Sequence, residues 1–329
     1  MNDREKKRVK SQIKLSVPIP AEPSPEEMLF VRQLGVDHVY TWVAADQRDY
    51  GFLADLRQRV EDAGLTLYNV GNVDVAKSDK IHLALDGRDQ VIAQFAQFVH
   101  DLGRAGIRRT TFTWEPTRVW SSEPGEIRGA RTRQVDLDEM VQRPYTHGRA
   151  YTEDEIWANF SYFMERIIPV AEAADVRLAL HPNDPPAPAL GGIPCLIHRF
   201  EDYERAFAIA DSPYLGMEFC VGCWLEGGDA FGDLFEGIRH FQEEGRILIV
   251  HLRNVSAPLP SFSETFLDNG YMDMYRVMKT FCEVGYDGTM TLDHTPRFAP
   301  GFEGAGTAYA VGYMRALIER AEAELSTAG

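Results

Sequence analysis

The sequence predicts a closed (β/α)₈ barrel, the TIM-barrel architecture of the α/β class. Eight short apolar runs alternate with eight longer segments whose apolar residues recur every three or four positions. Such strand–helix repetition normally builds a parallel sheet. A chain of 329 residues, 44% of them hydrophobic, is long enough for eight units around one core. A doubly wound open sheet is the competing arrangement.

The apolar runs are the expected strands, at residues 13–19, 38–43, 66–71, 108–114, 177–182, 215–222, 246–254 and 288–294. The amphipathic segments are the expected helices, at residues 24–35, 49–64, 88–106, 152–174, 200–210, 232–245, 272–285 and 307–325. In the first of these, Ser24 is the expected N-cap, Pro25 fits the first helical position and Gly35 suits the end.

The predicted domain organisation is simple. Residues 1–12 read as a charged, solvated tail, and residues 13–329 as a single barrel domain. The polar segment 119–151 carries five arginines and no clear period, so we expect a long loop insertion there. Because it follows the fourth strand, it lies on the side where barrel enzymes place their functional loops, and we interpret it as a lid or substrate-contacting insertion. A variable surface excursion is the alternative.

Charge and composition exclude several classes of partner. The formal net charge is −16, which disfavours nucleic acid and anionic membranes but leaves room for a small anionic substrate at a locally positive site. No apolar run approaches the length of a membrane span, and no signal peptide is recognisable. Four cysteines in a chain of this length do not form a disulfide framework, so we expect a cytoplasmic protein.

Four consecutive predicted strands end in residues of metal-ligand type: His181, Cys220, His251 and Asp293. The carboxyl ends of barrel strands lie side by side on the face that holds active sites. Each residue alone has an ordinary structural explanation, as a hydrogen-bonding histidine, a small core residue or a helix cap. Together, two imidazoles, a thiolate and a carboxylate suit a divalent cation with open positions for substrate.

Three further observations concern the surroundings of these strand ends. Cys220 and Cys223 form a C-x-x-C, but it follows the sixth strand and has no second copy, so we expect Cys220 alone to be a ligand. After His181, prolines stiffen a sharp turn that presents Asn183 and Asp184 as candidate substrate contacts. Trp114, at the end of the fourth strand, is another candidate substrate contact.

The order of motifs between residues 107 and 317 resembles the mannonate dehydratases. "HPNDPP" is similar to their H-P-D-D-P-P, "CVGC" to C-T-G-S, "HLRN" to H-x-R-N and "TLDH" to R-P-D-H. The resemblance implies a xylose-isomerase-like barrel that removes water from a hexonic acid such as D-mannonate, giving a 2-keto-3-deoxy acid. It also implies a divalent metal, usually Mn²⁺ with Fe²⁺, Co²⁺ or Zn²⁺ as alternatives, held by His181, Cys220, His251 and Asp293.

The same resemblance assigns roles around the metal. His294 would be the acid/base, since its ordinary pKa suits proton transfer. Arg253, a second candidate catalytic residue, would bind or orient the substrate together with Asn254. Two departures stand out: Thr291 replaces the arginine of R-P-D-H, and Phe302 replaces the tyrosine of a following P-G-Y that serves in proton transfer. Arg297 and Tyr309 are candidate replacements for the lost groups.

Because of these two departures, we consider three hypotheses for the function. An altered sugar-acid substrate on the retained metal scaffold is the simplest hypothesis. A metal-dependent isomerase or epimerase acting on a neutral sugar would need no carboxylate-binding arginine. A metal-binding or carbohydrate-sensing protein without turnover is the non-enzymatic alternative. In each case we expect a small-molecule ligand and a homo-oligomer, a dimer or higher.

Overall fold

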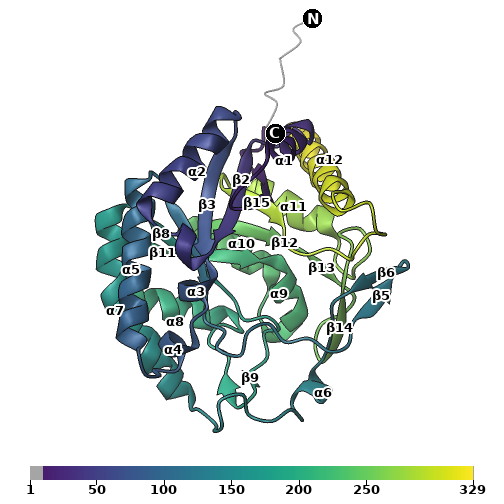
Figure 1. Cartoon of the computed structure of the whole chain (residues 1–329). Coiled ribbons are helices and arrows are strands. Elements are labelled where there is room, and N and C mark those ends of the chain that lie inside the picture. The colour runs from purple at the N-terminus through teal and green to yellow at the C-terminus, as the bar shows by residue number, and fades with distance from the viewer. Residues whose placement is uncertain (1–9, 329) are drawn as a thin grey trace, which may run out of the picture.

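The computed structural model describes residues 10–328, which form a barrel of parallel strands surrounded by helices (Figure 1). Hydrogen bonding runs β3-β2-β1-β15-β12-β11-β8-β4, and β3 and β4 lie side by side where the two ends of the sheet meet. The strands are β1 (Lys14–Pro18), β2 (His38–Val43), β3 (Thr66–Asn72), β4 (Arg109–Thr113), β8 (Arg177–His181), β11 (Leu215–Cys220), β12 (Ile247–Leu252) and β15 (Thr289–Leu292). These are the eight predicted strands, so the TIM-barrel prediction is confirmed and the open sheet is excluded.

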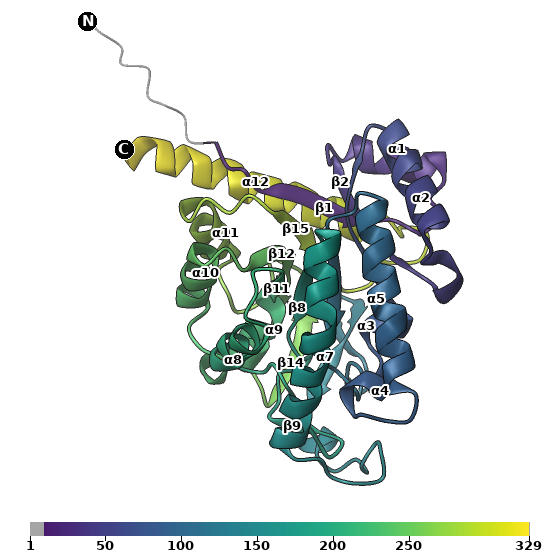
Figure 2. The same ribbon diagram turned by 90° about the vertical axis from the view of Figure 1, so that its left-hand side faces the viewer.

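The eight predicted helices are also present, and Figures 1 and 2 show them packed around the outside of the barrel. At the start of the first, the Ser24 hydroxyl accepts from the Glu27 N–H, and the Glu27 side chain accepts from the Ser24 N–H. None of the described helices is both long and apolar enough to cross a membrane. The helices are α1 (Pro25–Gln33), α2 (Tyr50–Asp62), α5 (Arg88–Arg104), α7 (Glu153–Ala174), α8 (Phe200–Ala210), α10 (Leu234–Glu243), α11 (Met274–Glu283) and α12 (Ala305–Ala328).

The two ends of the barrel interior differ in polarity. Near the amino ends of the strands, Tyr68 and Leu248 belong to a buried cluster with Ala179 and Ile249. The Tyr68 hydroxyl reaches across the barrel from β3 and donates to the Leu248 carbonyl of β12 at 3.0 Å. Among the described residues, this filling occupies the amino end, and the cavity that borders the strand-end histidines lies at the carboxyl end, as in other barrels of this kind.

Strand register aligns the candidate ligands at the carboxyl end. His181 on β8 pairs with Thr113 on β4, and Cys220 on β11 pairs with His251 on β12. His251 in turn pairs with Thr291 of β15, two residues before Asp293. Neighbouring strands in register place paired residues at one level, so the side chains of these strand ends converge.

The polar segment 119–151 is folded rather than irregular. It contains the hairpin β5 (Gly125–Ile127) and β6 (Ala130–Thr132), then β7 (Gln134–Asp136) and α6 (Leu137–Met140). β7 pairs with β14 (Ser261–Thr265), which follows the seventh barrel strand and also pairs with β13 (Asn254–Val255). Strands of two or three residues have too few positions to show a period, which is why the sequence did not reveal them.

Other short elements also escaped the sequence analysis. They are η1 (Ala45–Gln47), α3 (Val73–Ala76), α4 (Asp79–His82), β9 (Ala189–Leu190), β10 (Ile193–Pro194), α9 (Val221–Gly227) and η2 (Gly228–Ala230). Of these, α9 matters most to the site, because it begins directly after Cys220. Residues 1–9 of the predicted charged tail lie outside the described part of the chain.

Candidate metal centre

The four predicted ligands converge at the carboxyl end of the barrel. One donor atom each from His181, Cys220 and His251 lie within 4.8 Å of one another. Asp293 adjoins them, with Oδ2 at 3.6 Å from the Cys220 sulfur and Oδ1 at 3.4 Å from His251 Nδ1. Three donors from separate strands thus cluster together, and the carboxylate of Asp293, directly after β15, adjoins two of them.

The histidine contacts fix which nitrogens face this point. His181 Nδ1 lies 2.7 Å from the carbonyl of Pro182, which can only accept, so Nδ1 carries the hydrogen and Nε2 keeps its lone pair. His251 Nε2 lies 2.8 Å from Glu218 Oε1, so Nδ1 is the His251 nitrogen that is available to a metal ion. That Nδ1 is buried and has no hydrogen-bond partner. A buried nitrogen that makes no hydrogen bond and lies beside a sulfur and the Asp293 carboxylate is suited to be a metal ligand.

The Cys220 sulfur is set up as a thiolate. Burial raises the pKa of this thiol, but the hydrogen bond from Cys223 and the charge of Arg253 outweigh burial and hold it well below its usual range. Cys220 also caps α9, and the backbone N–H of Cys223 points to its sulfur at 3.5 Å. Burial and the neighbouring Cys220 sulfur raise the pKa of Cys223 well above normal, so this second cysteine remains a thiol.

The local charge favours a cation. Burial lowers the pKa of His181, but the hydrogen bond and charge of Cys220 raise it to about 9. The same environment that favours a proton on an imidazole favours a metal ion, which displaces that proton when it binds. The donor set of two imidazoles, one thiolate and one carboxylate therefore fits a divalent transition metal.

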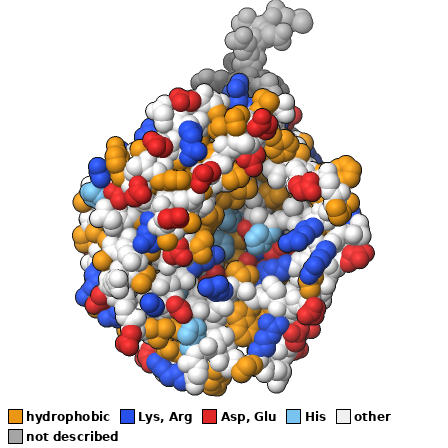
Figure 3. Space-filling model, in the orientation of Figure 1, with side chains coloured by type: hydrophobic (Ala, Val, Ile, Leu, Met, Phe, Trp, Pro, Cys, Tyr) orange, Lys and Arg blue, Asp and Glu red, His pale blue; other side chains and the backbone are white. Residues whose placement is uncertain are grey.

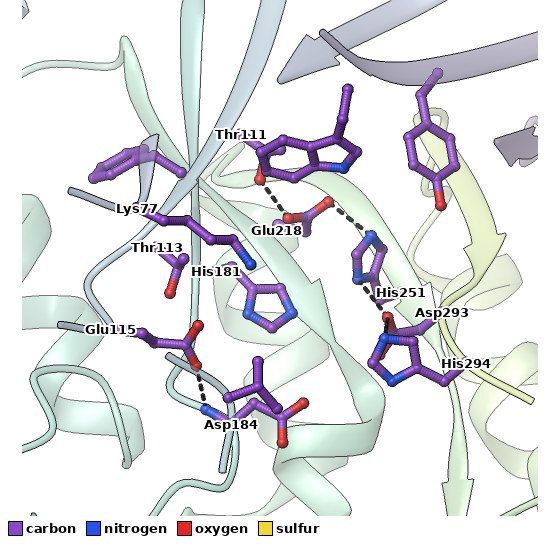
Figure 4. Close-up of a pocket in the computed structure, with 14 residues that line it drawn as sticks. Lys77, Thr111, Thr113, Glu115, His181, Asp184, Glu218, His251, Asp293 and His294 are labelled. Carbon is purple, nitrogen blue, oxygen red and sulfur yellow. Dashed lines mark hydrogen bonds and ion pairs between the residues drawn. The ribbon is translucent and has the colours of Figure 1, made fainter. Parts of the chain in front are cut away.

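A cavity of about 200 Å³ opens onto the donor cluster (Figure 4). His251, Asp293 and His294 lie on one side of it, Lys77 and Glu115 lie on the other, and His181 lies between them. In the space-filling view, the molecular face is hollowed at its centre, with histidine side chains visible inside (Figure 3). The lining residues are Tyr40, Trp42, Lys77, Thr111, Phe112, Thr113, Glu115, Val119, His181, Asp184, Glu218, His251, Asp293 and His294.

His294 is the predicted catalytic residue that the structure places at the cavity. Its side chain is 46% exposed, against 14% for His251. Nδ1 lies 3.0 Å from Glu264 Oε1, and Nε2 lies 3.4 Å from Asp293 Oδ1. The charge of Asp293 raises the pKa of His294, and the contact with Glu264 adds to that effect. The imidazole can therefore hold a proton beside the candidate metal site and still contact a molecule bound in the cavity.

Arg253 lies beneath the cavity instead of lining it. Its side chain has 0% exposure, and its guanidinium forms ion pairs of 2.7 Å with Glu264, 2.8 Å with Glu226 and 3.0 Å with Asp184. A fourth carboxylate, that of Asp293, lies at 3.3 Å. A cation so enclosed by carboxylates holds the base of the site together, and its guanidinium does not line the cavity.

The folded excursion after β4 supplies a second arginine to this network. Arg133 lies 2.7 Å from Asp184 Oδ1 and 3.1 Å from Glu264 Oε1. Burial raises the pKa of Asp184, but the charges of Arg133 and Arg253 outweigh burial and lower it. Asp184 lines the cavity as an anion held in place by two arginines, consistent with its prediction as a residue of the site.

The remaining predicted substrate contacts do not reach the cavity. Asn183 is buried, donating to the Trp114 carbonyl at 3.2 Å and accepting from the Ile197 N–H at 2.9 Å. Asn254 is buried and donates to the carbonyls of Leu267 and Met272. Their amides are saturated by backbone groups, so both residues shape loops.

Trp114 points away from the cavity because of the strand pleat. Thr113 and Glu115 line the cavity, and alternate residues of an extended chain face opposite sides. The indole therefore packs against Phe160 and Phe163 of α7, with ring centroids 5.2 and 5.7 Å away. It is 1% exposed, so we no longer expect it to contact substrate.

The sequence analysis missed several polar residues of the cavity. Glu218 accepts from the Thr111 hydroxyl as well as from His251, and its signal was a lone acidic residue inside an apolar strand. Glu115 directly follows β4, and its carboxylate accepts from the Asp184 N–H at 2.6 Å. The Lys77 ammonium lies 5.5 Å from the Trp42 ring centre and has no ion pair within the described residues.

The two departures from the resembled motifs lie in different places. Thr291 is buried in β15, and its hydroxyl lies near that of Tyr40, which lines the cavity. Phe302 is 62% exposed and does not line the cavity. The two candidate replacements, Arg297 and Tyr309, both border a separate hollow, and Arg297 also borders a cavity that includes His294.

Solved structures with similar folds define the structural class. A mannonate dehydratase from Streptococcus suis superposes with a TM-score of 0.82 at 24% identity, covering 96% of this chain and 95% of that one. An L-ribulose 3-epimerase gives 0.63 at 14% identity, covering 95% and 97%. The protein is a xylose-isomerase-like TIM barrel with a candidate metal site at the carboxyl ends of its strands.

Sequence comparisons narrow the class to one family. The family model described as D-mannonate dehydratase (UxuA) matches residues 129–327. The chain belongs to the mannonate dehydratase family. A mannonate dehydratase of Thermotoga petrophila is 31% identical over 276 residues, covering 73% of this chain and 75% of the relative, and one of Enterococcus faecalis is 28% identical over 311 residues, covering 82% and 85%. The family is one of metal-dependent hydro-lyases, so the dehydratase prediction is confirmed at this level and the isomerase alternative has less support.

Proposed function

We propose that this chain dehydrates a hexonic acid of the D-mannonate type to a 2-keto-3-deoxy acid. The observation that carries the proposal is the convergence of His181, Cys220, His251 and Asp293 beside a cavity that also exposes an acid/base histidine. When bound there, a divalent ion, for which we propose Mn²⁺, would act as a Lewis acid that stabilises charge developing on the substrate carboxylate.

His294 is the proposed proton-transfer group. Loss of water requires removal of the proton α to the carboxylate and departure of the β hydroxyl with a proton. Because Nδ1 of His294 faces Glu264, Nε2 is the nitrogen that can exchange a proton with the substrate. Glu264 would hold the ring orientation during that exchange.

Lys77 and Glu115 are the proposed contacts for the rest of the substrate. They line the cavity across from His294, and Trp42 and Tyr40 add aromatic and hydroxyl surface. Burial raises the pKa of Glu115, while the charge of Lys77 lowers it. An ammonium and a carboxyl group at this position can together donate to and accept from sugar hydroxyls.

The experiment that tests the function is an end-point assay for keto acid. Metal-loaded full-length protein and chelator-treated protein are incubated with D-mannonate, and 2-keto-3-deoxy acid is quantified. We expect product only with metal. Solvent-deuterium exchange into sugars without keto-acid formation would instead support the isomerase or epimerase alternative.

We also propose a cytoplasmic location and a homo-oligomeric state. The four cysteines are free in the structure, which suits a reducing compartment. Sedimentation of the purified protein tests the oligomeric state.

A further inference from the structure

Two arginines without a counter-ion lie opposite each other, beside the cavity that opens onto the metal-donor cluster. Arg131 on β6 and Arg297 after β15 form an isolated antiparallel bridge, in which the Arg297 N–H donates to the Arg131 carbonyl at 2.8 Å. Residues paired directly opposite project to the same face, with Cβ atoms about 5 Å apart, and like charges in that position repel. Among the described residues, neither guanidinium has a hydrogen bond, ion pair or ring contact.

These arginines line a second cavity that shares a wall with the first. This cavity has a volume of about 440 Å³ and includes Arg131, Arg297, Arg133 and the hydroxyls of Ser121 and Ser122. His294 borders both this cavity and the one over the metal cluster. A ligand that extends from the metal cluster past His294 therefore enters the arginine-lined space.

The charge of this space is locally positive in an acidic protein. Arg133 is neutralised by Asp184 and Glu264, so the uncompensated charge comes from Arg131 and Arg297. Figure 3 shows Lys and Arg side chains gathered on the rim of the central hollow, on the side where Figure 1 places the β5–β6 hairpin. The chain as a whole carries a formal charge of −16, so a positive surface here is a local exception. Both arginine side chains are exposed, so solvent screens part of their repulsion and an anion in the cavity can reach both guanidinium groups.

We propose that Arg131 and Arg297 form an anion subsite that holds a second acidic group of the substrate. Resting on the proposed function, this subsite defines the substrate as a dianionic sugar acid, with one carboxylate at the metal and a second anion beyond His294. The second anion is a terminal carboxylate, as in an aldaric acid, or a terminal phosphate. Both groups accept the paired N–H donors of guanidinium.

The test combines a binding arm and a turnover arm. In the first, binding of inorganic phosphate to metal-loaded full-length protein is measured by calorimetry for wild type, Arg131→Met/Arg297→Met and Arg131→Lys/Arg297→Lys. The control is Arg239→Met/Arg320→Met, which removes the same charge from outer helices α10 and α12. We expect Arg131→Met/Arg297→Met to weaken phosphate binding by roughly tenfold to a hundredfold. The lysine double variant and the Arg239→Met/Arg320→Met control should retain most of the binding.

In the second arm, kcat/KM is compared for D-mannonate, D-mannarate and 6-phospho-D-mannonate. We expect one dianionic acid to exceed D-mannonate, with that advantage lost in Arg131→Met/Arg297→Met and kept in the control; which acid wins identifies the second anion. Phosphate binding that is unchanged in the methionine variant, or equal kcat/KM for all three acids, would overturn the subsite. Arginine-dependent phosphate binding with no turnover of any acid would instead refute the proposed function and leave the anion subsite standing.

Discussion

The carboxylate of Glu218 lies 2.8 Å from Nε2 of His251, and this contact turns Nδ1 of the same ring toward Asp293 and the candidate metal. Glu218 is itself held by the Thr111 hydroxyl. A carboxylate that fixes the tautomer and orientation of a histidine ligand strengthens metal binding without touching the ion.

Glu218→Ala should therefore weaken metal affinity by about 10- to 100-fold. Glu218→Gln should retain most of the affinity, because its amide oxygen still accepts from Nε2–H. Mn²⁺ titration followed by electron paramagnetic resonance measures both. Glu201→Ala, an exposed carboxylate on α8, is the control. Equal affinities for Glu218→Ala and wild type would remove Glu218 from the site.

His294→Ala should keep bound metal and lose turnover. Proton transfer by a positioned side chain contributes about 10²- to 10⁴-fold, so a fall in kcat of that size is expected. Metal content and keto-acid production are measured on the same preparation, with His100→Ala on α5 as the control for an exposed histidine. Normal turnover in His294→Ala would show that another group transfers the proton.

Arg253→Met should reduce the stability of the fold. Removing one partner of a buried ion network typically costs about 3–5 kcal/mol, because carboxylates such as Glu226 are left buried and unpaired. Urea unfolding measures the free energy of unfolding. A variant with unchanged stability and a raised KM would instead support the original expectation that Arg253 contacts substrate.

His82 should make the protein sensitive to acid. Burial against Trp114 lowers the pKa of His82 to about 3, so the folded state keeps it neutral while the unfolded state protonates near its ordinary value. Its contribution to stability is complete above pH 6.5 and is lost as pH falls toward 3. Between pH 8 and pH 5, wild type should lose about 2 kcal/mol more than His82→Phe. The free energy of unfolding of both proteins is measured in urea at pH 8 and at pH 5. An equal loss of that free energy in wild type and in His82→Phe would contradict this account.

The barrel was predictable because its signals are local. Alternating apolar runs and amphipathic segments mark all eight strands and eight helices of the described barrel, and Ser24 and Pro25 mark one helix start. The metal-type residues were predictable for a related reason: strand ends such as those at Cys220 and His251 are brought to one rim by the fold itself.

The rest depends on contacts that sequence alone does not specify. The pleat decided that Glu115, not Trp114, lines the cavity. Arg133 reaches Asp184 only because the excursion after β4 folds back onto β14. Glu218 left a readable signal, a single carboxylate in a buried strand, whose partner became evident only from the register of β11 and β12.

Cobalt substitution tests the metal centre most directly. Full-length protein and Cys220→Ser are titrated with Co²⁺, and the near-ultraviolet absorption of a cobalt–thiolate bond is recorded against metal added. We expect wild type to saturate at one ion per chain with this band present, and Cys220→Ser to lack it. A wild-type protein that binds no Co²⁺, or a band that persists in Cys220→Ser, would contradict the assignment of these residues to one metal site.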